Sequence, residues 1–377
     1  MKYVTPADHA DTRRDVHPSQ RQHHVTPVNS PLYVITAVTN PHRYYTRYKL
    51  YQAFEKMCAD AGAVLYTVEV ALRDRHFEIT QPDNPQHIQL RSPEILWMKE
   101  NAQNIALSHL LRDHADAEYI AFIDGDIQFT RPDWVVETIQ QLQIYRVVQM
   151  WSVSIDLGPD SEHNATAYQQ PIAQCQSLMY SYMRDRSILQ PINRRQANQG
   201  NGAGNAKATG RGPGIFTDPS RDSYVGAQQP TGMLHTGYAW AWRRSALADV
   251  GGLGDIGILG SGDRHMAYAL LGEVGRSMHP ALHESYKHYW FEWEKRAEEH
   301  IKRKVGIVPG TLMHYWHGSK QFRRYQDRWK ILIENNFDWR TDLKKDVQGL
   351  WMLTERNWQL RDDLIGYFHV RAEDDGI

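Results

Sequence analysis

The feature that most constrains the fold is an alternation of apolar runs with helical periodicity in residues 31–155. Runs rich in β-branched and aromatic residues predict strands at 32–39, 63–72, 87–90, 119–123 and 147–155. Segments with helical spacing of apolar residues lie between them, at 44–61, at 98–114 and after Pro132. Strands that alternate with helices form a mostly parallel sheet covered on both faces. The sequence therefore predicts an α/β fold with a Rossmann-like central sheet flanked by helices.

The chain of 377 residues is long enough for one large α/β domain with additions. Residues 1–30 are polar and rich in His, Arg and Pro, and we expect a disordered tail there. Residues 31–325 are expected to form the main domain. Residues 326–377 are expected to form a helical C-terminal extension, within a final third that has helices near 286–304, 321–335 and 344–369.

The main domain divides at residue 155, where the regular alternation ends. The second half, 156–325, contains a stretch at 196–214 that is rich in Gly, Asn and Ala and lacks apolar periodicity. Such composition predicts a mobile loop, either a plain surface insertion or a lid over a substrate.

Composition narrows the class of protein. The net charge of −1 disfavours a protein held to nucleic acid mainly by charge. A mean hydropathy of −0.62 and the lack of a long apolar run argue against a transmembrane helix. The first thirty residues lack the apolar region of a signal peptide, and Cys58 and Cys175 make no disulfide framework. We therefore expect a cytoplasmic protein without a membrane partner.

Two carboxylates follow the apolar run 119–123 directly, at Asp124 and Asp126. Ligands of parallel sheets bind at the carboxyl ends of the strands, where both side chains are expected. Carboxylate oxygens suit Mg²⁺ or Mn²⁺, which can in turn hold a diphosphate. The alternative is a simple Asx-turn that ends the strand.

The segment 95–129, which ends in this Asp-Gly-Asp motif, resembles the donor half of GT-A glycosyltransferases. It is similar to family 2 enzymes and to the β-galactosyltransferase-like group. The resemblance implies a GT-A fold whose first half, 31–155, binds a nucleotide-sugar, with a UDP-sugar as the expected donor. Lys99 and Asn104 match a basic residue and an Asn of these enzymes, which implies that Lys99 contacts the diphosphate or the sugar.

Residues 40–51 follow the first strand, where GT-A enzymes place a nucleotide-binding loop. Asn40, Arg43 and Arg47 are therefore candidates for contacts with the donor.

The segment 235–272 resembles the acceptor half of the same enzymes, in which a Gly-rich stretch ends in an acidic residue. Asp263 matches that residue, which implies a catalytic base and an inverting reaction. The chain lacks the Glu-Asp pair and the Trp-Gly that usually accompany this base. The alternative is that Asp263 only caps the amino end of a helix.

The third similar segment is 310–325. In β-galactosyltransferase-like enzymes a late residue and a His three positions further on complete the metal shell, and His314 and His317 match these two positions. The implied ligands are Asp124, Asp126, His314 and His317, and imidazole ligands favour Mn²⁺ over Mg²⁺. Lys320, together with Arg323 and Arg324, is expected either to steady the diphosphate or to form a solvated helix face.

The predicted function is a metal-dependent glycosyltransferase. A further similarity to bacteriophage-encoded glycosyltransferases makes a hydroxymethyl-pyrimidine in DNA the first acceptor to consider, in the host cytoplasm, with a bacterial surface glycan as the alternative. A sugar nucleotidyltransferase would need a Gly-rich phosphate loop after the first strand, and residues 39–48 contain no glycine. A sugar- or DNA-binding protein on a decayed enzyme scaffold is the non-catalytic alternative. Three tryptophans, Trp290, Trp293 and Trp316, either stack on a ligand or fill the core.

Overall fold

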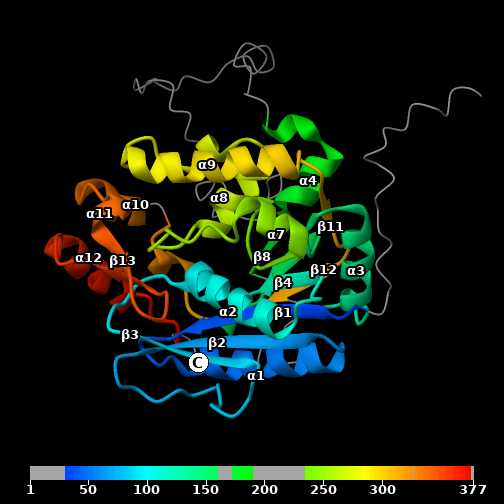
Figure 1. The fold of residues 1–377 in the computed structure, drawn as a ribbon, viewed down its shortest axis with the longest axis horizontal. Coiled ribbons are helices and arrows are strands. Elements are labelled where there is room, and N and C mark those ends of the chain that lie inside the picture. The colour runs from blue at the N-terminus through cyan, green and yellow to red at the C-terminus, as the bar shows by residue number, and fades with distance from the viewer. Residues whose placement is uncertain (1–29, 160–171, 190–233, 326, 375–377) are drawn as a thin grey trace, which may run out of the picture.

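The structure is a computed structural model that describes residues 30–159, 172–189, 234–325 and 327–374 (Figure 1). The expected tail, apart from Ser30, and the expected loop at 196–214 lie outside the described residues.

A seven-stranded sheet forms the centre of the described fold, in the order β11-β6-β10-β4-β1-β2-β3. Strands β3, β2, β1 and β4 are parallel, β10 is antiparallel to both of its neighbours, and β6 is parallel to β11. The strands are β1 (Leu32–Thr39), β2 (Val64–Leu72), β3 (His87–Ser92), β4 (Tyr119–Ile123), β6 (Val147–Gln149), β10 (Ala239–Arg243) and β11 (Val305–Ile307). The prediction of a mostly parallel central sheet is confirmed.

Helices cover both faces of this sheet, as Figure 1 shows, and each face has its own core. Tyr33 and Ile35 point to one face, whereas Leu32 and Val34 point to the other, as the period of two in a strand requires. The first face packs against α2 (Lys99–Asp113), α7 (Arg244–Val250), α8 (Gly262–Ala269) and α9 (Glu284–His300). The second face packs against α1 (Tyr45–Asp60) and α3 (Trp134–Ile144).

A smaller sheet lies beside the central one, in the order β5-β12-β7-β8-β9. Its strands are β5 (Ile127–Phe129), β7 (Val153–Asp156), β8 (Ala173–Ser177), β9 (Leu234–His235) and β12 (Thr311–His314). The single strand predicted at 147–155 is wrong, because β6 and β7 belong to different sheets. Met150 still donates its backbone N–H to Ala239 of β10, whereas Ser152 donates to Gly310 before β12. The apolar run is continuous because both sheets bury it.

The C-terminal extension contains a hairpin as well as helices. Its elements are α10 (Arg328–Glu334), α11 (Trp339–Asp342), β13 (Leu343–Lys345), β14 (Trp351–Leu353) and α12 (Trp358–His369). The helix predicted at 344–369 is therefore wrong in its first half. Asp346 accepts hydrogen bonds from the backbone N–H groups of Gln348 and Leu350, and Gly349 has φ +89°, which together close the hairpin turn.

Short helices complete the described fold: α4 (Leu178–Arg184), η5 (Arg186–Leu189), η6 (Val274–Ser277) and η7 (Lys320–Arg323). After α12 the chain returns to the first helix, so that the C-terminal end lies near α1 in Figure 1. The carboxylate of Asp374 accepts hydrogen bonds from the backbone N–H groups of Tyr45 and Thr46 at 2.9 and 3.1 Å.

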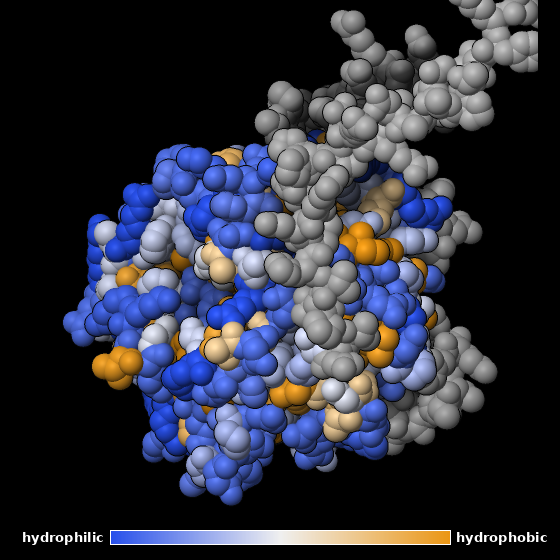
Figure 2. Space-filling view, turned by 45° about the vertical axis from the view of Figure 1, so that its right-hand side comes forward, coloured by the Kyte–Doolittle hydropathy of each residue, from blue (hydrophilic) through white to orange (hydrophobic). Residues whose placement is uncertain are grey.

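The face shown in Figure 2 is mostly hydrophilic, and its hydrophobic residues are scattered. Exposed large hydrophobic side chains such as Tyr45, Ile144, Val347 and Trp358 belong to different elements. In the described part of the chain, none of the helices combines the length and the apolar character needed to cross a bilayer.

Candidate active site

The candidate site lies where the direction of strand order changes. Strand β1 has β2 on one side and β4 on the other, and the helices α1 and α2 pack against opposite faces of the sheet. Open α/β sheets bind ligands in the crevice at the carboxyl ends of such adjacent strands. Strand β1 ends at Thr39 and is followed by Asn40, whereas β4 ends at Ile123 and runs into Asp124 and Asp126.

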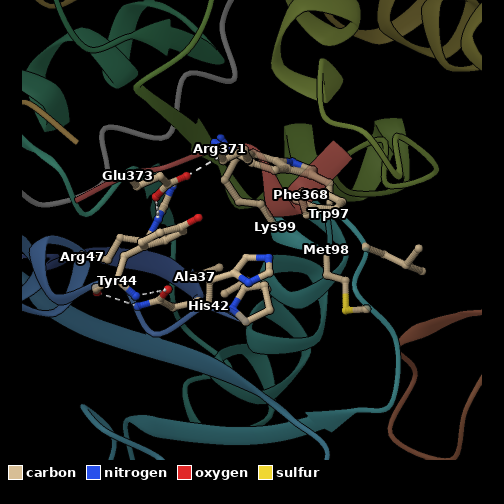
Figure 3. Close-up of a pocket in the computed structure, with 14 residues that line it drawn as sticks. Ala37, His42, Tyr44, Arg47, Trp97, Met98, Lys99, Phe368, Arg371 and Glu373 are labelled. Carbon is tan, nitrogen blue, oxygen red and sulfur yellow. Dashed lines mark hydrogen bonds and ion pairs between the residues drawn. The ribbon is translucent and has the colours of Figure 1, made fainter. Parts of the chain in front are cut away.

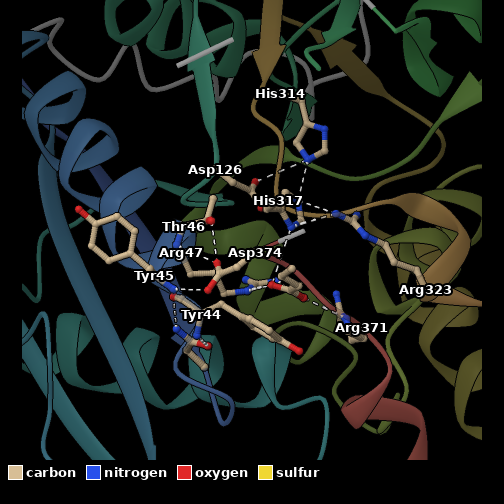
Figure 4. Close-up of polar contacts among 12 residues, drawn as sticks. Tyr44, Tyr45, Thr46, Arg47, Asp126, His314, His317, Arg323, Arg371 and Asp374 are labelled. Atoms are coloured by element: carbon tan, nitrogen blue, oxygen red, sulfur yellow. Dashed lines mark hydrogen bonds and ion pairs between the residues drawn. The ribbon is translucent and has the colours of Figure 1, made fainter. Parts of the chain in front are cut away.

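Asp126, His314 and His317 bring one ligand atom each to within 4.8 Å of one another (Figure 4). Nε2 of His317 lies 3.2 Å from Oδ2 of Asp126, and the two Nε2 atoms of the histidines are 3.1 Å apart. Asp126 lies in the turn that joins β4 to β5, and His314 ends β12, which is the partner of β5. The residues predicted from 310–325 are therefore brought to the Asp-Gly-Asp turn by strand pairing.

A buried carboxylate lies behind this group. Nδ1 of His314 donates a hydrogen bond to Oδ1 of Asp156 at 2.8 Å, and the Tyr238 hydroxyl donates to the same oxygen at 3.0 Å. Asp156 is 2% exposed. A carboxylate that holds Nδ1–H leaves the lone pair of Nε2 directed toward Asp126 and His317, as in histidines that bind metals.

The charges in the group match those of metal ligands. Burial, followed by the neighbouring guanidinium of Arg323, lowers the pKa of His317 to about 3. Burial alone would raise the pKa of Asp126, but His317, His314 and Arg47 hold it at about 2. Both side chains are thus unprotonated at neutral pH, the state that binding of a cation requires.

Oδ1 of Asp126 is a buried oxygen that has no hydrogen-bond partner among the described residues. Buried polar atoms are nearly always partnered, so an orphaned carboxylate oxygen beside two imidazoles indicates a missing ligand. One carboxylate and two neutral imidazoles suit a divalent transition ion and leave coordination positions open for a second ligand. The residues present therefore fit a bound cation.

Asp124 lies outside this group of three, although the sequence predicted it as a metal ligand. Oδ1 of Asp124 instead accepts a hydrogen bond from Nζ of Lys99 at 2.9 Å. Burial raises the pKa of Asp124 against the lowering effect of Lys99. Lys99 is the first residue of α2 and lines both of the pockets described next.

The first pocket has a volume of about 520 Å³ and opens at the end of β1 (Figure 3). Aromatic rings contribute much of its wall, from His42, Tyr44, Trp97 and Phe368. Cations also line it, from Arg47, Lys99 and Arg371, together with the carboxylate of Glu373. Flat apolar walls beside several cations suit a ligand that joins a ring to an anionic group.

The predicted donor contacts in 40–51 divide into two kinds. Asn40 and Arg47 line the first pocket. Asn40 also exchanges hydrogen bonds with the backbone of Tyr44, at 2.9 and 2.8 Å, and so shapes the loop before α1. Arg43 does not line the pocket, because its side chain is 57% exposed and forms an ion pair with Glu78.

Asn104 is a correction to the sequence-based prediction, because it lines neither pocket. Its side-chain amide donates to the backbone oxygen of Leu253 at 2.8 Å and accepts from the backbone N–H of the same residue at 2.9 Å. Both polar ends of Asn104 are thereby used to attach α2 to the loop after α7.

The second pocket, of about 420 Å³, contains Asp263, Asp124, Glu100 and Lys99. Among the described residues, the carboxylate of Asp263 has no hydrogen-bond or ion-pair partner, whereas that of Asp124 is paired with Lys99. Gly237 makes room for it, because a Cβ at that position would lie 2.4 Å from Oδ2 of Asp263. A carboxylate that faces a pocket without a protein partner is available to a ligand.

The alternative role of Asp263 as a helix cap is wrong. The cap position of α8 is Ser261, and Asp263 is the second residue of the helix, with no capping hydrogen bond. Its negative charge in the first turn still suits the helix dipole.

Glu100 is a buried acid that the sequence did not single out. It is 4% exposed, and Oε2 accepts a hydrogen bond from Nε1 of Trp97 at 3.0 Å. Burial, with Asp263 and Asp124 nearby, raises the pKa of Glu100 to about 7 although Lys99 opposes the shift.

The remaining predicted residues lie as follows. Trp290 and Trp293 are core residues, 0% and 1% exposed, and Trp316 is half-buried. Nη2 of Arg323 lies 2.7 Å from Nε2 of His317, whereas Arg324 is exposed. The side chain of Lys320 lies outside the described part of the structure.

Comparison with known proteins adds no relative: the chain matches none of the family models and none of the curated proteins at a significant level. Function therefore has to be argued from the site.

Proposed function

We propose that this protein is a metal-dependent glycosyltransferase that moves a sugar from a nucleotide-sugar to an acceptor hydroxyl. One observation carries the proposal: the group of metal-ligand type, Asp126, His314 and His317, lies beside the second pocket, whose lining residue Tyr238 has its ring 4.7 Å from the ring of His314. In this pocket Asp263 presents a carboxylate that has no hydrogen-bond partner among the described residues. A cation site and a free base next to each other are what a displacement at a sugar diphosphate needs.

The placement of the pockets supports the GT-A resemblance. The first pocket, with its aromatic walls, lies at the end of β1, where the resemblance places the nucleotide. The second lies against α8, where it places the acceptor. Lys99 borders both, so a donor could run from one pocket to the other past its ammonium group.

Asp126, His314 and His317 would hold the cation, and imidazole ligands favour Mn²⁺. A divalent ion at this position supplies positive charge that stabilises a diphosphate leaving group. Asp156 fixes the tautomer of His314, and Arg47 and Arg323 add positive charge on the donor side.

Asp263 acts on the acceptor in this mechanism. The acceptor oxygen attacks the anomeric carbon while its proton passes to the Asp263 carboxylate. The bond between the anomeric carbon and the diphosphate oxygen breaks, and its electron pair stays on that oxygen. A direct displacement of this kind inverts the anomeric configuration. Lys99, which is hydrogen-bonded to Asp124, lies between the two pockets and can orient the sugar.

A hydroxymethyl-pyrimidine in DNA is the first acceptor, and a bacterial surface glycan is the second. The rival reaction, nucleotidyl transfer, gains no support, since the loop from Thr39 to Arg47 offers side chains in place of a glycine-rich phosphate loop.

The decisive experiment incubates the protein with a panel of nucleotide-sugars and Mn²⁺, with EDTA in parallel. Release of nucleoside diphosphate that needs the metal supports the proposal, and labelled sugar on hydroxymethylated DNA but not on unmodified DNA would identify the acceptor. Activity with a sugar phosphate and a nucleoside triphosphate, with release of pyrophosphate, would instead show a nucleotidyltransferase. Asp362→Asn, an exposed substitution on α12, is the matched control.

A further inference from the structure

Two consecutive carboxylates at the C-terminal end lie in the candidate site. Oε1 of Glu373 is 3.0 Å from Nη2 of Arg47 and 3.0 Å from Nε of Arg371. Its other oxygen pairs with Nε of Arg47. Glu373 is 3% exposed and Arg371 is 7% exposed, so this is a buried charge cluster. The two arginines hold the pKa of Glu373 well below its usual range in spite of burial.

The next residue occupies a second position for an anion. Asp374 accepts hydrogen bonds from the backbone N–H groups of Tyr45 and Thr46 and, at 2.7 Å, from the Thr46 hydroxyl (Figure 4). These groups form the amino end of α1, a helix of 16 residues. The first helix after the first strand of such a sheet is a favoured place for phosphate groups, because its N–H groups and dipole attract negative charge.

Two of the cations near Glu373, Arg371 and Arg323, have other contacts that hold them in place, whereas Arg47 pairs with Glu373 itself. The Arg371 guanidinium lies over the Trp97 ring at 5.3 Å and over the Phe368 ring at 5.9 Å. Arg47 projects from α1, and Arg323 is placed by His317 and by the Tyr325 hydroxyl at 3.1 Å. Without Glu373, the buried Arg371 and the half-buried Arg47 would be cations without a paired carboxylate, which is costly unless another anion takes its place.

Arg323 adds an independent sign of a ligand. Its Nε is buried and has no hydrogen-bond partner among the described residues, as is true of Oδ1 of Asp126 nearby. Among the described residues, Nε of Arg371 is a second buried donor without a hydrogen-bond partner, although it lies in an ion pair with Glu373.

We propose that Arg47, Arg371 and the amino end of α1 form a diphosphate-binding site that the chain's own Glu373 and Asp374 fill in place of the ligand. The two adjacent carboxylates stand for the two adjacent phosphates of a nucleoside diphosphate. Binding of the ligand displaces residues 373–374, and Arg371 stays with Trp97. The inference rests on the proposed function for the identity of the ligand, but its charge chemistry follows from the residues alone.

The C-terminal segment 371–374 also packs closely against the chain next to His317. A Cβ on Gly318 would lie 2.6 Å from the backbone oxygen of Ala372 and 2.7 Å from Cα of Glu373. Gly318 follows His317 directly and has φ +88°, so both space and backbone favour glycine there. Residues 372–373 thus pack closely against the backbone at Gly318, in a position that a larger residue there would block.

The test measures binding of inorganic pyrophosphate by calorimetry, in EDTA, to the full chain and to Glu373→Gln/Asp374→Asn. If the tail competes, the double variant should bind at least about tenfold more tightly, since apparent affinity scales with the fraction of open site. Asp362→Asn, which removes an exposed charge on α12, should bind like the parent chain. Unchanged or weaker binding by the double variant would overturn the inference.

Two further arms make the result specific. The double variant should gain much less affinity for orthophosphate than for pyrophosphate, relative to the parent chain. An equal gain in affinity for both would refute a diphosphate site. In the unmodified chain, pyrophosphate should speed amide hydrogen exchange of residues 371–374, an arm that does not depend on how well the variants fold; slower or unchanged exchange would show that the tail stays in place. Because no sugar or acceptor is involved, these outcomes are independent of whether glycosyl transfer is found.

Discussion

Nδ1 of His314 and Oδ1 of Asp156 lie 2.8 Å apart, and the same two residues are direct partners in the register of β12 and β7. The hydrogen bond that orients this proposed metal ligand is therefore built from a cross-strand pair. Loss of the carboxylate partner of a metal-binding histidine typically lowers metal affinity about 10- to 100-fold, a change in binding free energy of about one to three kcal/mol.

Asp156→Ala should weaken Mn²⁺ binding about 10- to 100-fold, because His314 loses the group that fixes its tautomer. Asp156→Asn keeps an acceptor oxygen and should lose less. Tyr238→Phe removes a different hydrogen bond to Asp156 and is the matched control for a disturbance of this buried pair. Calorimetric titration with Mn²⁺ measures all three, and equal affinities in Asp156→Ala and the parent chain would exclude the role.

Removal of the metal should abolish transfer. EDTA should reduce the rate to background, and Mn²⁺ should restore it better than Ca²⁺, which prefers oxygen ligands. His317→Ala should reproduce the effect of EDTA, whereas His109→Ala, a half-buried histidine of α2 outside the group of three, should not. Full turnover in EDTA would contradict the assignment of Asp126 and both histidines.

Asp263→Asn should lower turnover about 100-fold or more, because a positioned base is lost while its shape is kept. Asp263 makes no capping bond, so Asp263→Ala should give a similar loss with little change in melting temperature. Two other acidic residues of this half are poorly placed to act as the base: Glu284 is 87% exposed, and Asp255 accepts hydrogen bonds from Tyr289 and Asn101. Near-normal turnover of Asp263→Asn, with donor affinity intact, would place the base elsewhere.

Glu100 should make stability depend on pH. Its pKa is raised from 4.5 in the unfolded chain to about 7 in the fold, so the folded state binds more protons between these values. The free energy of unfolding should therefore fall as pH rises through this window, by on the order of 2–3 kcal/mol in total. Glu100→Gln removes the titration and keeps an acceptor for Trp97. Thermal unfolding at pH 5 and pH 8 tests this, and parallel curves for both proteins would contradict it.

Local pattern predicted the parts of the fold that local interactions decide. The strand 119–123 is buried along its whole length, and Asp126 follows from its end. His317 could be placed near that end only through the resemblance, because the pairing of β12 with β5 joins residues far apart in the chain. Asn104 matched a motif but serves packing, which depends on the position of Leu253 and no local signal reports.

The C-terminal segment 371–374 was the least predictable part of the site. Residues 371–374 (Arg-Ala-Glu-Asp) have no apolar periodicity, and their approach to Arg47 depends on the hairpin and α12 turning the chain back. Likewise, the break between β6 and β7 is invisible in a continuous apolar run, because both halves are buried. Long-range return of the chain, rather than composition, decides these features.

The chain crosses between the two sheets at Met150–Ser152, and again at the Asp-Gly-Asp turn between β4 and β5. His314 and its partner Asp156 belong to the smaller sheet, whereas Asp126 lies in the turn that connects β4 of the central sheet to β5 of the smaller one. A bound cation would therefore link the smaller sheet to the end of strand β4 in the central sheet. Without it, the smaller sheet should behave as a separate cooperative unit that opens at lower cost than the central sheet, so that chelation loosens one half of the molecule before the other.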